Sequence, residues 1–512
     1  MTNHAPTPPP PAHPVQSAPP RYPTTPAPRY VANDDWITRQ FRIRLPASAA
    51  PGTVLVLCLI VGLCAAVLLP DGLGGLGLSL FVVLAVAGLI IGAALGTQAL
   101  MILGVTSGLA VALVFRESGL LRLGLAALVA GTFLVAAIVA RRGSIFDVSI
   151  VRATLGVIGS CIHALLTPAW LFQGCREPIP TRRSISAAVI ARIGLLTLPV
   201  LVLIAALLSS ADAFFASLFA PDLESLFVWG FFFTVGGLMF AAVLRTATVG
   251  ISPVSAADSM RVSRLETAIT LGGIALLLAA FVGIQIFSEL ATGRDSLSAR
   301  GISYADYARS GYIQLLIVVG LVTVVLASFD RLARGVGGRR FVFQRVLSAV
   351  IVALTLAVVG VALRRLALYC EAYGLTMLRL ACVAGAVWFV VALLMVAARL
   401  LGIGETRNWL PGATGLALVA ITLSFSAINP QQIVVEYNLD RATTISLDLK
   451  YLTSLSSDAV PALVAALPQL NPTDSTYVKT RLCKRYSEPT SWTQINLSRI
   501  NAQHALEGVC PQ

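Results

Sequence analysis

The chain has 512 residues, of which 57% are hydrophobic and only 12% are charged, and its mean hydropathy is +0.83. Soluble globular proteins carry about 25% charged residues, so this chain has too few polar side chains to cover a water-soluble globule. We expect an all-α, polytopic helical membrane bundle, because lipid offers no partners for backbone groups and helices satisfy their own.

The first 28 residues contain eleven prolines. Proline fixes φ and lacks an N–H group, so residues 1–35 are expected to be a disordered, Pro-rich cytoplasmic tail. Their order of residues does not fit a secretory signal peptide. A docking role for the sequence "PPPP" is the alternative to a solvated tail.

Apolar runs long enough to cross the hydrocarbon core recur throughout residues 50–428, where we expect the transmembrane bundle. Eleven spanning helices are predicted, near residues 53–69, 75–95, 99–115, 120–140, 187–208, 225–244, 267–288, 312–329, 346–363, 375–398 and 411–428. The stretch 150–172 contains Arg152, His163 and Pro168. It is expected to lie at the interface or dip partway into the bilayer, with a twelfth span as the alternative.

The arginines predict the orientation, because basic residues accumulate in cytoplasmic loops. With the N-terminus inside, the inner flanks hold 19 arginines and the outer loops hold six. This distribution favours a cytoplasmic N-terminus and an exterior C-terminus. The net charge of +13 is attributed to this orientation and to anionic lipid, so the bilayer is an expected partner and nucleic acid is not.

Glycines recur every fourth residue in two of the expected spans: Gly88, Gly92 and Gly96 in one, and Gly104 and Gly108 in the next. Small residues at this spacing let helix backbones approach closely. Packing within the chain is the favoured interpretation, and homodimerisation is the alternative.

Residues 429–512 are expected to form a small α-helical unit outside the membrane, because they carry seven basic and seven acidic residues. Leucines and valines at helical spacing predict a helical segment over 447–470, interrupted near Ser456–Pro461, with Asp458 at a helix start. Further helices are expected over 474–486 and 492–507.

Eight cysteines are present, none in a CxxC pair, so no zinc site is expected. Only Cys483 and Cys510 lie in the expected exterior unit. A disulfide between them is permitted in an oxidising compartment, and two buried free thiols are the alternative.

The sequence contains no phosphate-binding loop, no HExxH, no GxSxG and no dinucleotide-binding motif. No carboxylate lies deep in an expected span, which makes a proton-coupled transporter less favoured. We therefore expect no enzymatic activity, no catalytic residues, no cofactor and no bound metal.

Polar residues gather on the predicted outer side, in the stretch 281–316 and in "RRLALYCEAYGLTMLRL" (364–380), which is expected to form the outer loop between the ninth and tenth spans. Glu371 is expected to pair with an arginine there, since an unpaired charge near hydrocarbon is costly. A structural clamp between helix ends is the favoured interpretation and a ligand-binding vestibule the alternative. The candidate outer polar cluster comprises Gln285, Glu289, Tyr304, Tyr307, Arg309, Arg364, Arg365, Glu371 and Arg379.

Five ordered blocks give a resemblance to a known family: "FVGIQIFSEL…SYADYARSGYIQLL", "YCEAYGLTMLRL", "AINPQQIVVEYNLDRA", "LDLKYLTSLSSDAVPAL" and "SWTQINLSRINA". Across residues 187–505 the chain resembles the bacterial integral-membrane family catalogued as Domain of Unknown Function 4173. It departs from that pattern at "SELATG", where the family has phenylalanine-glycine-glycine. The resemblance implies a bacterial multi-span membrane protein, which with the orientation above is expected in the bacterial cytoplasmic (inner) membrane, and it carries no established activity.

Two function classes follow. The favoured one is a non-enzymatic membrane scaffold or signalling partner that binds a protein through residues 429–512. The alternative is a solute transporter or small-ligand receptor that uses the polar vestibule on the outer side.

Overall fold

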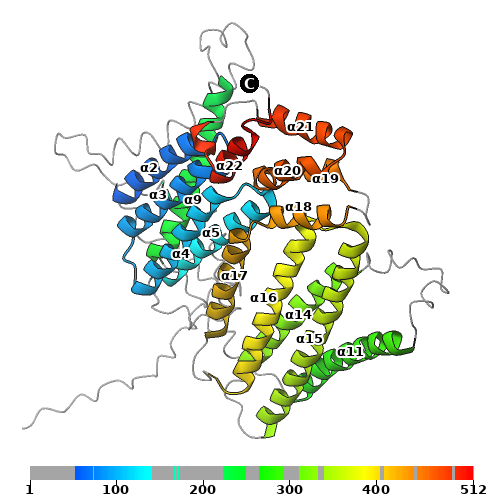
Figure 1. Ribbon diagram of the computed structural model, residues 1–512. Coiled ribbons are helices and arrows are strands. Elements are labelled where there is room, and N and C mark those ends of the chain that lie inside the picture. The colour runs from blue at the N-terminus through cyan, green and yellow to red at the C-terminus, as the bar shows by residue number, and fades with distance from the viewer. Residues whose placement is uncertain are drawn as a thin grey trace, which may run out of the picture.

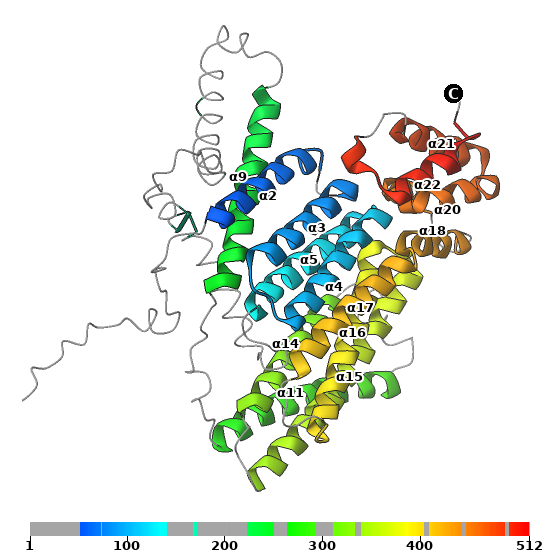
Figure 2. The same cartoon turned by 90° about the vertical axis from the view of Figure 1, so that its left-hand side faces the viewer.

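The computed structural model describes residues 52–72, 74–140, 167–168, 170–171, 204, 223–249, 264–291, 311–332, 339–403, 409–442, 447–486 and 491–510. Three sequence expectations fall largely or wholly outside these residues: the tail 1–35, the stretch 150–172 and the span near 187–208. Throughout the described ranges the regular elements are helices, as Figures 1 and 2 show.

The expected helical membrane bundle is confirmed. Within the described residues, nine helices are long and apolar enough to cross a membrane, and α2 is a shorter apolar helix. The helices of the bundle are α2 (Gly52–Leu68), α3 (Gly75–Gly92), α4 (Thr97–Phe115), α5 (Gly119–Val139), α9 (Leu223–Val249), α11 (Arg264–Ala291), α14 (Tyr312–Leu332), α15 (Arg339–Tyr373), α16 (Met377–Leu400) and α17 (Trp409–Ala427).

These helices form two groups, each with its own apolar core. One core is built by α2–α5 and α9, and it also takes in Val419 of α17. The other is built by α11 and α14–α16, together with Leu410 at the start of α17. Helix α17 therefore belongs to both cores, and Figure 1 shows it between the two groups.

Close packing in the first group depends on glycines. A Cβ at Gly88 would lie 2.9 Å from the Phe240 ring, and one at Gly92 would lie 2.8 Å from Leu244. These glycines let α3 lie against α9, as the sequence pattern predicted for packing within the chain. The pattern fails at Gly104 and Gly108 of α4, where an added Cβ would meet no atom within 4 Å.

The prediction of an outer loop is wrong for residues 364–373, which belong to α15. They are not an outer loop, since α15 continues without a break through 35 residues to Tyr373. Charged side chains do not end a helix; the break comes at Gly374, whose φ of 76° suits glycine. The connection to α16 is consequently short.

The C-terminal unit, residues 429–510, covers one end of the bundle, here called the tail end (Figure 2). Its core joins Val434, Leu463 and Val478 to Leu366 and Met377 of the bundle. Its elements are α18 (Pro430–Asp440), α19 (Leu449–Ser454), η2 (Ser457–Ala459), α20 (Val460–Ala466), η3 (Leu467–Gln469), α21 (Pro472–Tyr486), η4 (Trp492–Gln494) and α22 (Leu497–Leu506). The expected third helix, 492–507, is thus split into η4 and α22.

The contacts show at which end of the bundle α3, α5 and α9 begin and end. The starts of α3 and α5 both contact the C-terminal unit. Helix α9 runs parallel to α3, because Phe240 lies beside Gly88 and Leu244 beside Gly92. Helix α5 therefore ends at the far end of the bundle and α9 begins at the tail end.

We predict that Gly236→Ala destabilises the bundle by about 1–3 kcal/mol, the usual cost of overpacking. A Cβ at Gly236 would overlap the Cβ of Ala65 where α9 crosses α2. Thermal unfolding in lipid nanodiscs measures the effect. The matched control, Gly104→Ala, adds its methyl group to open space and should not lower the melting temperature. Equal melting temperatures for both variants would contradict the proposed close contact.

Candidate functional site at the tail end

Part of the predicted outer polar cluster lies outside the description. Tyr304, Tyr307 and Arg309 are not among the described residues. Glu289 is in the last turn of α11, and its side chain is also outside the described part. The structure places the remaining members: Gln285, Arg364, Arg365, Glu371 and Arg379.

These five residues do not form one cluster of contacts. Arg365 Nη2 donates to Gln285 Oε1 at 3.4 Å, which joins the tail ends of α15 and α11. Arg364 and Glu371 are exposed. Within the described ranges no ion pair joins Glu371 to an arginine.

Arg379 is buried in the first turn of α16 and is held by its own hairpin. Its guanidinium lies 3.9 Å from the centre of the Tyr369 ring. It also donates to the carbonyl oxygens of Tyr373, at 3.2 Å, and Gly374. A cation over an aromatic face, away from water, is a stabilising arrangement. Arg379 therefore clamps the end of α15 to the start of α16.

The C-terminal unit completes this hairpin. Asn438 of α18 accepts a hydrogen bond from Leu375 N at 3.0 Å and donates one to Leu375 O at 2.8 Å. The hydroxyl of Tyr451 accepts one from Met377 N at 2.9 Å. A Cβ at Gly374 would collide with Asn438 Oδ1. The glycine thus serves both the turn and the close approach of α18.

On the other side of the tail end, Asp458 of η2 contacts the loop between α4 and α5. Its Oδ2 accepts hydrogen bonds from Glu117 N at 2.8 Å and Ser118 N at 2.9 Å. Its Oδ1 lies 3.6 Å from Arg116 Nη1, and its side chain is only 1% exposed. A carboxylate beside the N-terminus of α5 satisfies free N–H groups and complements the helix dipole.

Arg116 meanwhile contacts the C-terminal end of α17. Its Nε donates to Ser426 O at 2.7 Å, and its Nη2 donates to Ala427 O at 2.9 Å. A cation is favourable there, because the last carbonyl groups of a helix have no partner within it. Asp458 and Arg116 together therefore tie α5, α17 and η2.

Glu117 extends this network into the C-terminal unit. Its carboxylate lies 3.7 Å from Arg122 Nη2 of α5 and 3.8 Å from Arg499 Nη1 of α22. It also accepts a hydrogen bond from Ser457 Oγ. That hydroxyl lies 2.7 Å from the hydroxyl of Tyr486, and burial raises the pKa of Tyr486.

Asn496 caps two helices at once. Its Oδ1 accepts from Ser498 N at 2.9 Å at the start of α22. Its Nδ2 donates to Leu113 O at 3.1 Å and Arg116 O at 3.0 Å at the end of α4. Asn496 is 1% exposed, so an apolar residue in its place would remove a buried donor from Leu113 O. Arg116 O also accepts a hydrogen bond from Arg122 Nε, at 3.4 Å.

Asp71, in the turn between α2 and α3, is hydrogen-bonded to the segment that contains η4. Its Oδ2 accepts hydrogen bonds from Ser491 Oγ and, at 2.5 Å, from Thr493 Oγ1. These hydrogen bonds lower the pKa of Asp71. Beside it, Leu76 N donates to Ile495 O at 3.0 Å, at the start of α3.

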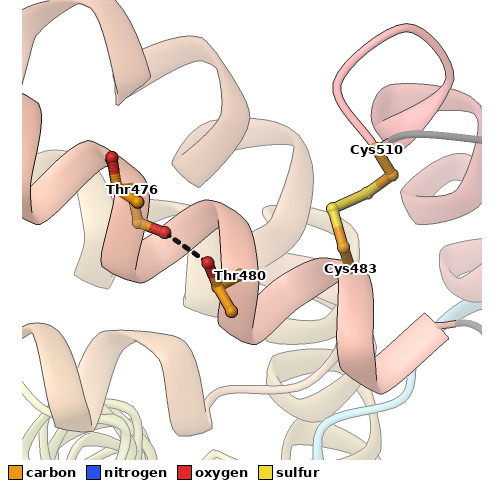
Figure 3. The surroundings of a disulfide bond; sticks show 4 residues. All are labelled: Thr476, Thr480, Cys483 and Cys510. Carbon is orange, nitrogen blue, oxygen red and sulfur yellow. Dashed lines mark hydrogen bonds between the residues drawn. A yellow bond between two sulfur atoms is a disulfide. The ribbon is translucent and has the colours of Figure 1, made fainter.

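A disulfide joins Cys483 of α21 to Cys510, with Cα atoms 5.6 Å apart (Figure 3). The same helix carries the Thr480 Oγ1 hydrogen bond to Thr476 O at 2.8 Å. The bridge connects α21 to the segment that follows α22. The four free cysteines of the described residues are Cys58, Cys64, Cys370 and Cys382.

The tail-end junction, by which we mean the contacts that Asp71, Arg116, Glu117, Asp458 and Asn496 make between the bundle and the C-terminal unit, consists of hydrogen bonds and charge pairs. No group of three His, Cys, Asp or Glu side chains in the described part could hold a metal ion. An apolar cavity of about 430 Å³ between α3, α5 and α9 has no titratable side chain in its lining, which includes Phe81, Phe133 and Phe240. The hydrogen bonds of Arg116, Asp458 and Asn496 to backbone groups suit the tail-end junction to positioning helix ends.

Sequence reasoning missed the main contacts of this junction. The sequence predicts that Asp458 caps the start of its own helix; instead its carboxylate accepts hydrogen bonds from the N–H groups of Glu117 and Ser118. A polar triplet, Arg116–Glu117–Ser118, between two apolar runs is the available signal. Its partner lies about 340 positions away, and no local pattern identifies such a pair.

We predict that Asp458→Ala lowers the unfolding free energy on the order of 3 kcal/mol, because it leaves the N–H groups of Glu117 and Ser118 without their acceptor and Arg116 without its counter-charge. Asp458→Asn keeps one acceptor oxygen and should cost less. Hydrogen exchange should increase at residues 117–118 and in α20 and α22. Glu436→Gln, at an exposed residue of α18, is the control. Unchanged exchange in Asp458→Ala would refute the role of this carboxylate.

Comparison with known families gives a match to the family described as Domain of unknown function (DUF4153), over residues 100–466. No curated protein and no solved structure matches the chain. The sequence blocks led to a family of unknown function with a different number, 4173; the kind of family is confirmed and the number is not. The match extends from α4 to α20 and includes both Arg116 and Asp458. Because it covers well over half of the sequence, the chain belongs to the DUF4153 family.

Proposed function

We propose that this membrane protein is a non-enzymatic scaffold or signalling partner that presents its C-terminal unit to another protein. The observation that carries this proposal is the set of hydrogen bonds that hold the unit to the bundle. Side chains from α18, α19, η2 and the segment after η4 satisfy backbone groups at the ends of four membrane helices or in the turns beside them. A unit held at so many points offers a preorganised surface, which lowers the entropy cost of binding.

Helix α21 is the best candidate for the partner surface. It lies on the side of the unit away from the membrane helices in both views (Figures 1 and 2). Its apolar face, with Val478 and Leu482, is buried in the unit. The exposed sides of α21 carry Tyr477, which is 42% exposed, and three basic residues: Lys479, Arg481 and Lys484. Arg485 instead donates from Nη1 to Leu455 O at 2.5 Å within the unit. A basic face with an aromatic residue suits an acidic protein partner.

We place the protein in a bacterial cytoplasmic membrane, with the tail end exterior. Two observations support this orientation. The tail end bears the short turns at 69–74, 116–118 and 374–376, which belong to the arginine-poor side of the sequence. The Cys483–Cys510 disulfide also fits an oxidising exterior compartment.

A photocrosslinking amino acid in place of Tyr477 tests the scaffold proposal in cells. We expect one discrete adduct, lost in the double variant Lys479→Glu/Arg481→Glu because charge reversal repels an acidic partner. Substituting Lys450→Glu, in α19 and exposed, is the matched control and should retain the adduct. An adduct that survives the double variant, or none at all, contradicts a partner surface on α21.

A solute transporter or small-ligand receptor with a vestibule at the tail end is the second candidate. The contact between Arg365 and Gln285 favours it, because it brings two polar side chains of the predicted cluster together. A ligand bound only by the folded state raises stability by about 2.7 kcal/mol at a hundred times its Kd. Under this function, thermal unfolding in nanodiscs should shift with one member of a panel of ions, amino acids, sugars and nucleotides. Arg365→Ala should abolish that shift, and Lys479→Ala should keep it. No shift across the panel would remove the second candidate.

A further inference from the structure

Four apolar side chains of the C-terminal unit are exposed close together in the sequence. Trp492 is 52% exposed, Ile495 43%, Leu497 41% and Ile500 39%. Between them, Thr493, Asn496 and Ser498 are buried and face the unit or the bundle. Apolar residues on the exposed side of a segment, with polar residues on the covered side, reverse the usual pattern for a surface in water.

The height of this segment above the bundle is fixed by its contacts with α3. Leu76 N donates to Ile495 O at 3.0 Å. An added Cβ at Gly77 would lie 3.1 Å from the Cβ of Thr493, and one at Gly75 would lie 2.8 Å from Ile495 O. Helix α3 is a candidate membrane span from Gly75 onward. The segment 491–497 therefore lies beside the first turn of a helix that is long and apolar enough to cross a membrane.

The indole N–H of Trp492 differs from those of two tryptophans of the bundle, which donate to backbone carbonyl groups. Trp388 Nε1 donates to Thr414 O at 3.0 Å, and Trp409 Nε1 donates to Ile403 O at 3.1 Å. For Trp492 Nε1 the described residues supply no acceptor. Tryptophan is enriched at membrane interfaces, because its ring is apolar while its N–H can bond to headgroup or water oxygens.

We infer that Trp492, Ile495, Leu497 and Ile500 form an interfacial foot that inserts into the lipid headgroup region at the tail end. The bilayer is the occupant that the geometry favours, since the foot lies beside the first turn of a spanning helix. Hydrogen bonds to Asp71 and Leu76 hold the backbone, and the apolar side chains are left to face lipid. The C-terminal unit thus contacts the membrane directly as well as through the helix ends.

Depth-dependent fluorescence quenching tests the foot in the full-length protein. Reconstitution uses phosphatidylcholine vesicles with bromine atoms either near the headgroup or near the chain ends. The wild-type emission minus that of Trp492→Phe isolates the Trp492 component. We expect this component to be quenched more strongly by the shallow bromines than by the deep ones. Trp492→Tyr is a second variant if the first is poorly folded.

Trp388 provides the matched control, because it lies midway along α16. The component lost in Trp388→Phe should be quenched more strongly by the deep bromines. Two results would overturn the foot. One is a Trp492 component quenched by aqueous iodide and by neither brominated lipid, which means that the side chain faces water. The other is a component that no quencher reaches, which means that protein, such as a second copy of the chain, covers it.

Discussion

The structure depends on one constraint: every membrane helix ends with backbone groups that have no partner within the helix. At the tail end of this bundle, the C-terminal unit supplies many of those partners. Asp458 binds the N–H groups of Glu117 and Ser118 at the start of α5, and Asn496 binds the carbonyl groups of Leu113 and Arg116 at the end of α4. The unit and the bundle therefore stabilise each other.

The buried charges of the tail end also lie at helix ends. A carboxylate lies at a helix N-terminus and a guanidinium at a helix C-terminus, and Asp458 and Arg116 are themselves 3.6 Å apart. Each charge interacts with a helix dipole as well as with the other charge. The side chain of Asp458 is almost completely buried. Removing either partner would consequently leave the other in an environment that water does not reach well.

The sequence was most informative where a pattern is local. Apolar length predicted the spans at 75–95, 120–140 and 375–398 to within a few residues, because lipid sets the length of a helix that crosses it. It failed at 364–373, where charged residues suggested a loop although nothing there breaks a helix. The contacts of Asp458 and Asn496 could not be predicted. They join segments more than 300 residues apart, and hydrogen bonds of that range leave no periodicity in the sequence.

Helix α15 has a mechanical consequence. At 1.5 Å per residue, its 35 residues form a rod of about 52 Å, whereas the hydrocarbon core is about 30 Å thick. Tilting alone does not absorb this difference, since membrane helices rarely tilt beyond about 40°. One end of the rod, at Leu366 and Cys370, is embedded in the core of the C-terminal unit. A displacement of that unit is thus carried by one continuous helix toward the opposite face of the membrane.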